Sequence, residues 1–341
     1  MLSPPSAVLA AFGAAGSRPV PLGGGQGRSW LAGDVVIKPA EADLEELTWQ
    51  DLIFSQMSSA GLRLARPRRA ADGSLLVDGW CATEHVTGTH QPGRWPEIIV
   101  VGERFHAALR GIPRPSFLDQ RASRWAISDR VAWGEIPASE FPYVRHLPGL
   151  VSALRPVTAA SQLIHGDLTG NVLFDRLQPP AIIDFSPYWR PTAYASAIVV
   201  ADALVWEGAD RKVLDAVTHI DEFGQYLVRA LIFRAVTDWI FRQEESANSA
   251  AEGDDPWARA VNIACQLAAA GRLCDGLAAD GGGCWLSWTG PAAVSATVPP
   301  PFRLRTAERR EGPGRWCSPS TLMANSSPSA RVNTAAPTTT G

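Results

Sequence analysis

The stretch LIHGDLTGNVLFDRLQPPAIIDF, residues 163–185, constrains the fold of this chain more than any other part of its sequence. A strand-like approach ends at a polar turn, and two short apolar runs, 172–174 and 181–183, follow on either side of two prolines. Apolar runs of this length around a proline turn predict paired strands. We therefore expect a hairpin whose polar side chains meet at one end.

Three polar side chains would gather at that end: Asp167, Asn171 and Asp184. Phosphoryl transfer needs a carboxylate that accepts the proton of the attacking hydroxyl, and an amide oxygen and a second carboxylate that hold magnesium on the phosphates. The pattern predicts Asp167 as the catalytic base and the other two as metal ligands. Asp and Asn are also ordinary turn residues, so the prediction rests on their combination. His165 is interpreted as a structural residue that braces the loop.

Residues near this stretch leave alternatives open. Tyr188, Trp189 and Arg190 follow it directly, and they either line an acceptor site or pack against a helix predicted at 193–207. Asp202 interrupts the apolar face of that helix, and we interpret it as a buried carboxylate satisfied by loop amides.

An upstream stretch, PLGGGQGRSW, is rich in glycine. Glycine lets backbone N–H groups come close to phosphate oxygens, so Gly24, Gly25 and Gly27 are predicted to bind a nucleotide. A glycine cluster alone is weak evidence for such a site. No GxxxxGK[ST] motif occurs, which excludes a P-loop.

A lysine strengthens the nucleotide prediction. Lys38 ends the run VVIK, eleven residues after Gly27, and a lysine on the strand after a glycine-rich turn contacts the α- and β-phosphates in kinase-like folds. Its ion-pair partner is expected from the next helix, where Glu46 is preferred and Glu45 is the alternative.

The chain divides by composition near residue 276. Residues 277–341 are rich in glycine, proline, serine and threonine and lack periodic apolar positions, so they are predicted to form a mostly disordered tail. Before it we expect an N-terminal extension at 1–17, a β-rich nucleotide-binding N-lobe at 18–84 and an α-rich catalytic and acceptor-binding C-lobe at 85–276.

Local patterns predict the individual elements. In the N-lobe we expect a strand at 35–38, a helix at 44–57 capped by Asp43, and two strands at 64–70 and 74–80. The segment 80–92 would connect the lobes. The C-lobe helices are expected at 96–110, 144–154, 193–207, 211–218, 221–245 and 256–275.

Composition limits the classes of partner. Of the 341 residues, 46% are apolar and 19% charged, and the net charge is -3, which favours a soluble globular protein over a nucleic-acid binder. The arginines at 63, 66, 68 and 69 are interpreted as a solvated loop face. A small-molecule partner fits better, and the oligomeric state stays open.

Cysteine usage and the N-terminus suggest a compartment. The five cysteines show neither CxxC spacing nor nearby histidines, which argues against a zinc site and a disulfide framework. The first residues lack the pattern of a signal peptide, and the longest apolar run is too short to span a bilayer. We expect a cytoplasmic protein that does not enter a membrane.

Together, HGDLTGNVLF, IIDF and the VVIKP strand with its preceding glycines resemble the aminoglycoside phosphotransferase superfamily of kinase-like enzymes, which also includes choline, homoserine, fructosamine and methylthioribose kinases. The resemblance covers residues 18–275. HGDLTGNVLF followed by IDFSPYWRP is similar to an uncharacterised actinobacterial group within that superfamily. The resemblance implies a two-lobed α+β protein-kinase-like fold, with Mg²⁺ as cofactor and ATP or GTP as phosphoryl donor.

The same resemblance implies site residues and an activity. Asp167 would be the catalytic base, Asn171 and Asp184 the magnesium ligands, Lys38 the phosphate-binding lysine, and residues 81–84 the hinge beside adenine. The enzyme would move the γ-phosphoryl group of a nucleotide to the hydroxyl of a small molecule, which the sequence does not identify.

The sequence departs from the superfamily pattern in two places. Many members have five residues from the base to the amide, whereas Asn171 follows Asp167 by four, so Gly170 is expected to adopt a positive φ. SPYWRP, residues 186–191, also replaces the usual stretch after the metal-binding aspartate. The alternatives to a kinase are a nucleotide-binding pseudokinase or regulatory module, and a degraded paralogue.

Overall fold

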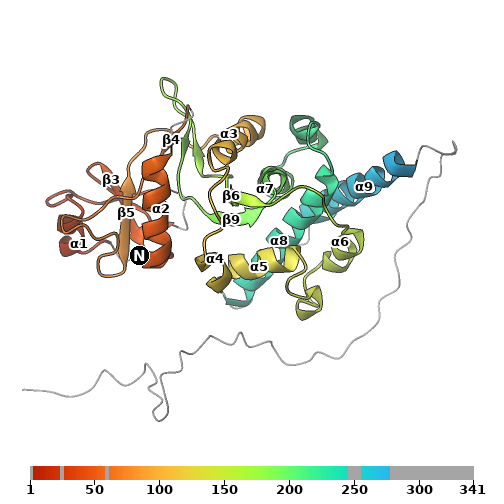
Figure 1. Ribbon diagram of the computed structural model, residues 1–341, viewed down its shortest axis with the longest axis horizontal. Helices are drawn as coiled ribbons and strands as arrows, with labels where there is room; N and C mark the ends of the chain where they lie inside the picture. The colour runs from red at the N-terminus through yellow and green to blue at the C-terminus, as the bar shows by residue number, and fades with distance from the viewer. Residues whose placement is uncertain (1–2, 24–26, 58–60, 245–254, 277–341) are drawn as a thin grey trace, which may run out of the picture. The chain divides into compact units, whose positions relative to one another are not determined.

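The computed structural model describes residues 3–23, 27–57, 61–244 and 255–276. Short strands and the helices α1 (Ser6–Ala11) and α2 (Leu44–Gln56) come first, and helices dominate after residue 94 (Figure 1). This order confirms the predicted α+β class, with a β-rich N-lobe before an α-rich C-lobe. The predicted tail, 277–341, lies outside the described residues.

Within the described residues, the N-lobe strands form a four-stranded antiparallel sheet. Its order is β1 (Val20–Pro21), β2 (Trp30–Ala32), β3 (Val35–Pro39) and β5 (Trp80–Glu84). The predicted strand 35–38 is confirmed as β3, in which Val35 and Ile37 are buried on alternate positions. The register places Lys38 opposite Cys81.

The strands predicted at 64–70 and 74–80 are wrong. β4 is limited to Arg63–Leu64, and the strand that pairs with β3 runs from Trp80 to Glu84. The chain between them folds as a loop against β5, where the Arg68 amide donates to the Ala82 carbonyl at 2.8 Å. The expected hinge, 81–84, therefore lies inside a strand of the N-lobe sheet rather than in a connector.

The N-terminal residues belong to the N-lobe core. α1 (Ser6–Ala11) packs against the sheet, and Val8 and Phe12 share a buried cluster with Ile37 and Trp80. The described part of the predicted extension, 1–17, is therefore not separate from the N-lobe. Because a helix this short has few residues of its own to bury, it is held by the sheet that it covers.

The helix predicted at 44–57 is confirmed as α2 (Leu44–Gln56). The Asp43 carboxylate caps it by accepting a hydrogen bond from the Glu46 amide at 2.9 Å. Glu45 and Glu46 lie in the first turn, where the helix dipole favours negative charge.

The C-lobe consists of helices around two small sheets. The helices predicted around 96–110, 144–154, 193–207, 221–245 and 256–275 all form, and the one at 211–218 is a 3-10 helix, whereas α4 and α5 were not predicted. In chain order they are α3 (Trp95–Ala108), α4 (Phe117–Gln120), α5 (Arg124–Ala132), α6 (Leu147–Ala153), α7 (Thr192–Val205), α8 (Phe223–Glu244) and α9 (Pro256–Gly276), with 3-10 helices at Ala138–Glu140 and Arg211–Val217.

α7 lies at the centre of the C-lobe. Every residue from Tyr194 to Val205 is buried, and the helix packs against α3, α8 and α9 (Figure 1). A helix that is apolar on all sides must be surrounded by other elements. Asp202 is the one carboxylate in this buried stretch, and it faces α8.

One hairpin and one pair of strands that are not consecutive in the chain carry the motif residues. β7 (Val172–Leu173) pairs antiparallel with β8 (Ala181–Ile182), which confirms the predicted hairpin. β6 (Gln162–His165) pairs antiparallel with β9 (Pro187–Arg190). β4 adds to β8 as a parallel strand, so the chain before β5 is hydrogen-bonded to the C-lobe hairpin.

The cluster of arginines in the N-lobe is partly exposed, with 37% of the Arg68 side chain and 50% of the Arg69 side chain accessible, but its members also bind neighbouring elements. Arg63 donates to the Pro179 and Thr87 carbonyls at 2.8 Å each, Arg66 to the Phe54 carbonyl, and Arg69 to Asp51 at 2.5 Å. Arg68 forms an ion pair with Asp34. These side chains fasten loops to neighbouring elements and are not free to form a basic patch.

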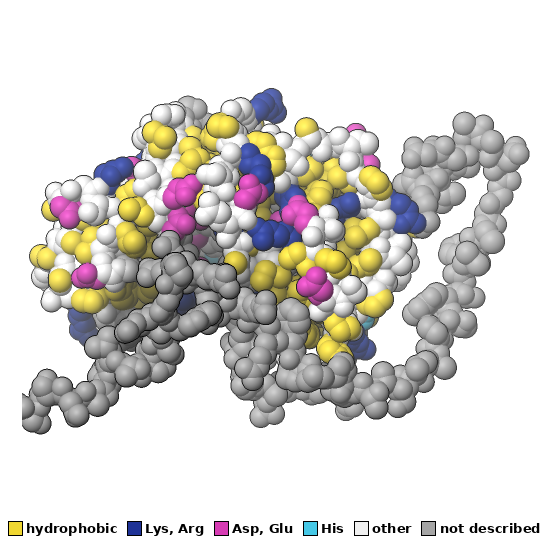
Figure 2. Space-filling view, turned by 60° about the horizontal axis from the view of Figure 1, so that its bottom comes forward, with side chains coloured by type: hydrophobic (Ala, Val, Ile, Leu, Met, Phe, Trp, Pro, Cys, Tyr) yellow, Lys and Arg dark blue, Asp and Glu magenta, His cyan; other side chains and the backbone are white. Residues whose placement is uncertain are grey.

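Charges of both signs are mixed on the surface. On the face drawn in Figure 2, acidic and basic side chains lie next to one another near the middle of the described residues. None of the helices in the described ranges is long and apolar enough to cross a membrane.

A buried histidine makes the stability of the fold dependent on pH. His106 on α3 is 1% exposed, and its Nε2 accepts a hydrogen bond from the His165 amide at 3.0 Å. Burial, followed by the neighbouring His165, lowers the pKa of His106 from 6.5 to about 3. Between pH 6.5 and about pH 3, the unfolded chain therefore binds a proton at this histidine and the folded chain does not. The contribution of His106 to the free energy of unfolding is fully present above pH 6.5 and decreases as the pH falls through this range.

The pH dependence of unfolding should report this group. Between about pH 6 and pH 4 the parent should lose about 1.4 kcal/mol per pH unit more than His106→Gln, whose side-chain oxygen can still accept a hydrogen bond. Denaturant unfolding at several pH values measures the slope. His219→Gln, at a histidine whose side chain is 57% exposed, is the matched control. Equal slopes in the parent and His106→Gln would contradict the prediction.

Candidate active site

The loop between β6 and β7 is held by a buried ring. Nδ1 of His165 accepts hydrogen bonds from the amides of Asp167, at 3.2 Å, and Ser186, at 3.4 Å. Its Nε2 lies 3.3 Å from the Ile183 carbonyl, to which it donates as the neutral tautomer. Burial lowers the pKa of His165, which keeps the ring uncharged. The ring thus braces the loop, as interpreted from the sequence.

The structure brings Asp167, Asn171 and Asp184 to the same end of the β7–β8 hairpin. The Asn171 amide nitrogen donates to the Asp167 carbonyl at 2.7 Å and lies 3.3 Å from the Asp167 carboxylate. The Ile183 amide donates to the Asn171 carbonyl at 3.0 Å, so Asn171 sits across the hairpin from the residue before Asp184. Asp184 itself has a φ of 48°, a left-handed conformation that is uncommon for aspartate.

Gly170 allows the shortened loop to close. Its φ is 80°, which confirms the predicted positive value. The backbone N–H of Asn171 donates to the Leu168 carbonyl at 3.0 Å and so closes the turn. A Cβ atom at this position would meet no atom within 4 Å, so only the backbone conformation selects glycine here. The four-residue spacing therefore still keeps Asn171 in contact with Asp167.

Lys38 reaches this end of the hairpin from the N-lobe. Its Nζ lies 2.5 Å from a carboxylate oxygen of Asp184, and both side chains are 30% exposed. Burial opposes the charge on Lys38, but the Asp184 carboxylate outweighs it and raises the pKa of the lysine. The contact joins two predicted site residues that are 146 positions apart in the sequence.

The expected ion pair between Lys38 and Glu46 is not formed. Glu46 pairs with Arg121 instead, and burial raises the pKa of that carboxyl group despite the guanidinium beside it. Arg121 also donates to the Pro187 carbonyl at 2.7 Å, so it joins α2 to β9. The alternative residue, Glu45, accepts a hydrogen bond from Ser116 at 2.8 Å. Lys38 therefore pairs with Asp184 of the C-lobe.

The glycine-rich turn is described only in part. Gly24 and Gly25 lie outside the described residues. Gly27 has a φ of 67°, a conformation that favours glycine.

A pocket opens next to the catalytic loop. It has a volume of about 380 Å³ and lies between α5, α7 and α8. Thr169 of the loop and Arg234 of α8 line it on the side of Asp167, and the rings of Trp125, Trp206 and Phe241 form apolar walls. A pocket of this size beside a carboxylate can hold a small molecule.

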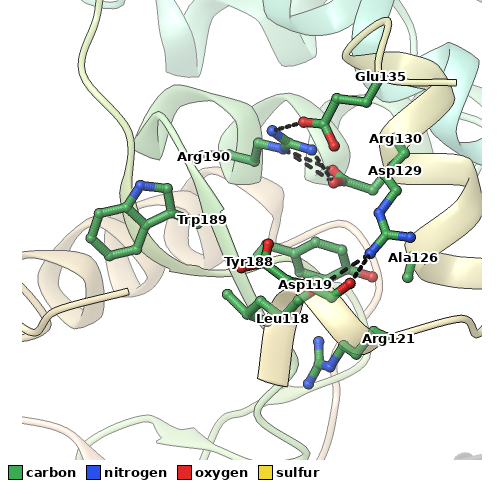
Figure 3. Close-up of a pocket in the computed structure, with 10 residues that line it drawn as sticks. All are labelled: Leu118, Asp119, Arg121, Ala126, Asp129, Arg130, Glu135, Tyr188, Trp189 and Arg190. Carbon is green, nitrogen blue, oxygen red and sulfur yellow. Dashed lines mark hydrogen bonds and ion pairs between the residues drawn. The ribbon is translucent and has the colours of Figure 1, made fainter. Parts of the chain in front are cut away.

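The residues after Asp184 do not line that pocket. Tyr188, Trp189 and Arg190 border a separate cavity of about 50 Å³. Figure 3 shows Arg190 between Asp129 and Glu135, with bonds of 2.6 Å and 2.7 Å, while the Trp189 ring points away from them. The stretch does pack, but its contacts are with α5 and α8 rather than with the helix predicted at 193–207, since Arg190 pairs with Asp129 and the Tyr188 ring packs against Phe233.

The donor set suits magnesium. Asp184 offers carboxylate oxygens and Asn171 an amide oxygen, which are the hard ligands that Mg²⁺ prefers together with phosphates and water. The Asn171 amide nitrogen faces the Asp167 carbonyl, which leaves its oxygen directed elsewhere. In the described part of the chain, no group of three or more His, Cys, Asp or Glu residues could hold a metal ion.

Sequence reasoning missed the cation nearest to Asp167. Arg234 on α8 donates to the Asp167 carboxylate at 2.8 Å and to both oxygens of Asp202. Asp202 is buried as predicted, but its carboxylate is satisfied by this arginine and not by loop amides. Arg234 follows Asp167 by 67 positions, and no motif marks it because the contact depends on how α7 and α8 pack.

No protein-family model matches the chain, and neither does any curated protein. Solved structures are similar to it in fold. An aminoglycoside phosphotransferase from Alicyclobacillus acidocaldarius is 16% identical with a TM-score of 0.48, over 80% of this chain and 93% of that chain.

Two other solved structures are also similar in fold. An amicoumacin kinase, in complex with AMP-PNP, Ca²⁺ and Ami, is 12% identical with a TM-score of 0.49, over 74% of this chain and 88% of that one. A choline/ethanolamine kinase family protein from Mesorhizobium loti is 16% identical with a TM-score of 0.46, over 75% of this chain and 88% of that one. Each likeness is one of fold alone.

The close contact between Gly166 and Tyr188 predicts a sensitive position. A Cβ atom at Gly166 would lie 2.3 Å from Cδ2 of the Tyr188 ring, and that ring packs against Phe233 at 6.1 Å. We expect Gly166→Ala to lower the free energy of unfolding by about 1–3 kcal/mol. Denaturant unfolding measures the change.

Gly149→Ala is the matched control, because a Cβ atom there meets nothing within 4 Å and the residue is helical. It should be neutral or stabilising by up to about 1 kcal/mol. Combining Gly166→Ala with Tyr188→Leu should recover part of the loss. Equal stability of the two glycine variants would show that the loop can shift away from the ring.

Proposed function

We propose that this protein is a magnesium-dependent phosphotransferase that moves the γ-phosphoryl group of ATP or GTP to the hydroxyl of a small molecule. The observation that carries the proposal is the convergence of Asp167, Asn171 and Asp184 on one end of a hairpin, with Lys38 reaching Asp184 from the other lobe at 2.5 Å. A base, a metal-binding pair and a cationic phosphate contact are the groups that this reaction needs.

Asp184, Asn171 and Lys38 bind the nucleotide in this proposal. Asp184 and Asn171 would hold Mg²⁺, which supplies positive charge against the phosphates. Lys38 is paired with Asp184 in the structure, and the triphosphate would give the ammonium group a second anionic partner. Because both side chains are partly exposed, the pair can exchange for these new contacts.

Asp167 acts on the acceptor. Its side chain is 39% exposed, so a hydroxyl group can reach the carboxylate. The acceptor oxygen forms a bond to the γ-phosphorus as the bond to the bridging oxygen breaks, and the hydroxyl proton passes to the Asp167 carboxylate.

The pocket beside Asp167 is the proposed acceptor site. Four charged residues line the pocket. Asp202 and Arg234 form an ion pair, and the other two are Glu207 and Asp238. Glu207 accepts a hydrogen bond from Trp95, and Asp238 is paired with Arg242 at 2.9 Å. The excess of carboxylates and the aromatic walls favour a neutral or cationic hydroxyl compound with an apolar face over an anion.

A nucleotide-binding module without transfer activity is the second candidate. The observation in its favour is that one oxygen of Asp167 is already engaged by Arg234 at 2.8 Å. Such a module would bind nucleotide at Lys38 and Asp184 and would release no phosphate.

Nucleotide binding should depend on Asp184. Asp184→Ala removes a metal ligand and the partner of Lys38, so magnesium-dependent ATP affinity should fall by about tenfold or more. Calorimetry with ATP, with and without Mg²⁺, measures the change. Asp129→Ala is a poor control because it would remove the buried partner of Arg190, whereas exposed Asp72→Ala should leave the affinity unchanged. Affinity that is unaltered in Asp184→Ala would overturn the metal assignment.

Phosphate release should depend on Asp167. Asp167→Asn keeps the shape of the side chain but removes the proton acceptor, so magnesium-dependent phosphate release from ATP should fall about a hundredfold or more while ATP still binds. Water serves as the acceptor in this assay, which needs no identified substrate. If the parent releases no phosphate although it binds Mg-ATP, the module without transfer activity is the correct function.

A further inference from the structure

The guanidinium of Arg234 connects the proposed base to the interior of the C-lobe. Its Nη2 donates to Oδ1 of Asp167 at 2.8 Å and to Oδ2 of Asp202 at 2.7 Å, and its Nε donates to Oδ1 of Asp202 at 2.8 Å. The Arg234 and Asp202 side chains are 7% and 5% exposed. One buried cation therefore holds a buried carboxylate with two bonds and a more exposed carboxylate with one.

The arginine itself is rigidly held. It is on α8, while Asp202 is on α7, so the paired helices fix both ends of the two-bond contact. The ring of Phe233 lies 5.1 Å from its guanidinium carbon, and that of Trp206 lies 5.9 Å away. Burial opposes its charge, but the carboxylates of Asp202 and Asp167 outweigh it and raise the pKa of Arg234 above its ordinary value. The cation thus stays charged at every pH at which the fold persists.

The contacts of Asp167 distinguish its two oxygens. Oδ1 accepts the Arg234 bond, whereas among the described residues Oδ2 has only the longer approach of the Asn171 side-chain amide at 3.3 Å. A planar carboxylate with one oxygen fixed has little rotational freedom left. Oδ2 is then the oxygen that remains for a hydroxyl group.

We propose that Arg234 is a positioning residue that fixes the orientation of Asp167 and reserves Oδ2 for the proton of the acceptor hydroxyl. Asp202 anchors Arg234 and does not touch the reacting groups. The inference rests on the proposed function, because it assigns Arg234 a role through the proposed base. Arg234 also lines the acceptor pocket, so the acceptor would enter against the same guanidinium that orients the base.

Two other roles predict different results. If Arg234 only holds α7 against α8, its loss would lower stability, nucleotide binding and phosphate release together. It could also block Asp167, and its loss would then raise turnover. A positioning role acts only through Asp167, so its effect must vanish when the carboxylate is absent.

Arg234→Lys tests the role, because lysine keeps the charge but cannot make the forked contact to both carboxylates. Magnesium-dependent phosphate release from ATP should fall about 10-fold to 100-fold in kcat, as expected for a misplaced catalytic group. The KM for ATP should stay within about twofold. In the Asp167→Asn background, the same substitution should cause no further loss of the residual rate.

Arg229→Lys is the matched control. Arg229 is on the same helix, is 7% exposed and donates to the Gln225 and Arg155 carbonyls, away from the catalytic loop. It should leave the kcat of phosphate release near that of the parent. Asp202→Asn is the second test variant in case Arg234→Lys folds poorly. It keeps the Arg234 side chain but loosens its anchor, so kcat should fall less, and again only when Asp167 is present.

The outcomes separate the inference from the proposed function. Equal losses from Arg234→Lys with and without the Asp167 carboxylate would show a structural role and overturn the inference. A higher kcat in Arg234→Lys would show that the contact blocks the base, which overturns it as well. A parent protein that binds Mg-ATP but releases no phosphate would overturn the proposed function, and Arg234 would then have no base to position.

Discussion

The neutral ring of His165 is the contact on which the rest of the site depends. It receives the amides of Asp167 and Ser186 and donates to the carbonyl of Ile183, so a single side chain connects β6, the catalytic loop, β8 and the start of β9. Protonation would convert its acceptor nitrogen into a donor and break the two amide contacts. Burial prevents that change, since it keeps the ring uncharged.

The two lobes are joined by polar contacts that meet around the hairpin. β4 adds a parallel strand to β8, Glu46 of α2 pairs with Arg121, and Lys38 of β3 pairs with Asp184. Each contact links an N-lobe element to a segment next to the catalytic loop. The position of Lys38 relative to the hairpin is therefore determined by several connections and does not rest on its own ion pair alone.

The sequence predicted what is local and missed what depends on packing. Asp167, Asn171 and Asp184 could be found because they lie within one short stretch, residues 163–185, and Gly170 because the loop is one residue shorter than the superfamily pattern. The partner of Glu46 and the role of Arg234 depend on where helices meet, which no nearby pattern encodes. The misplaced strands at 64–70 and 74–80 have a similar cause, because their apolar residues pack as a loop against β5.

Two carboxylates of the site are each held by one cation, but the two ion pairs differ in burial. Lys38 and Asp184 are both 30% exposed, whereas Arg234 is 7% exposed and is also bound to buried Asp202. Solvent and phosphate oxygens can replace a partly exposed partner at little cost, but removing a buried guanidinium would leave the Asp202 charge unpaired at a cost of about 3–5 kcal/mol. In the proposed kinase, nucleotide binding would therefore rearrange the Lys38 pair while the Arg234 contacts persist. The proposed metal ligand Asp184 is then the adaptable half of this site, and the proposed base Asp167 is the fixed half.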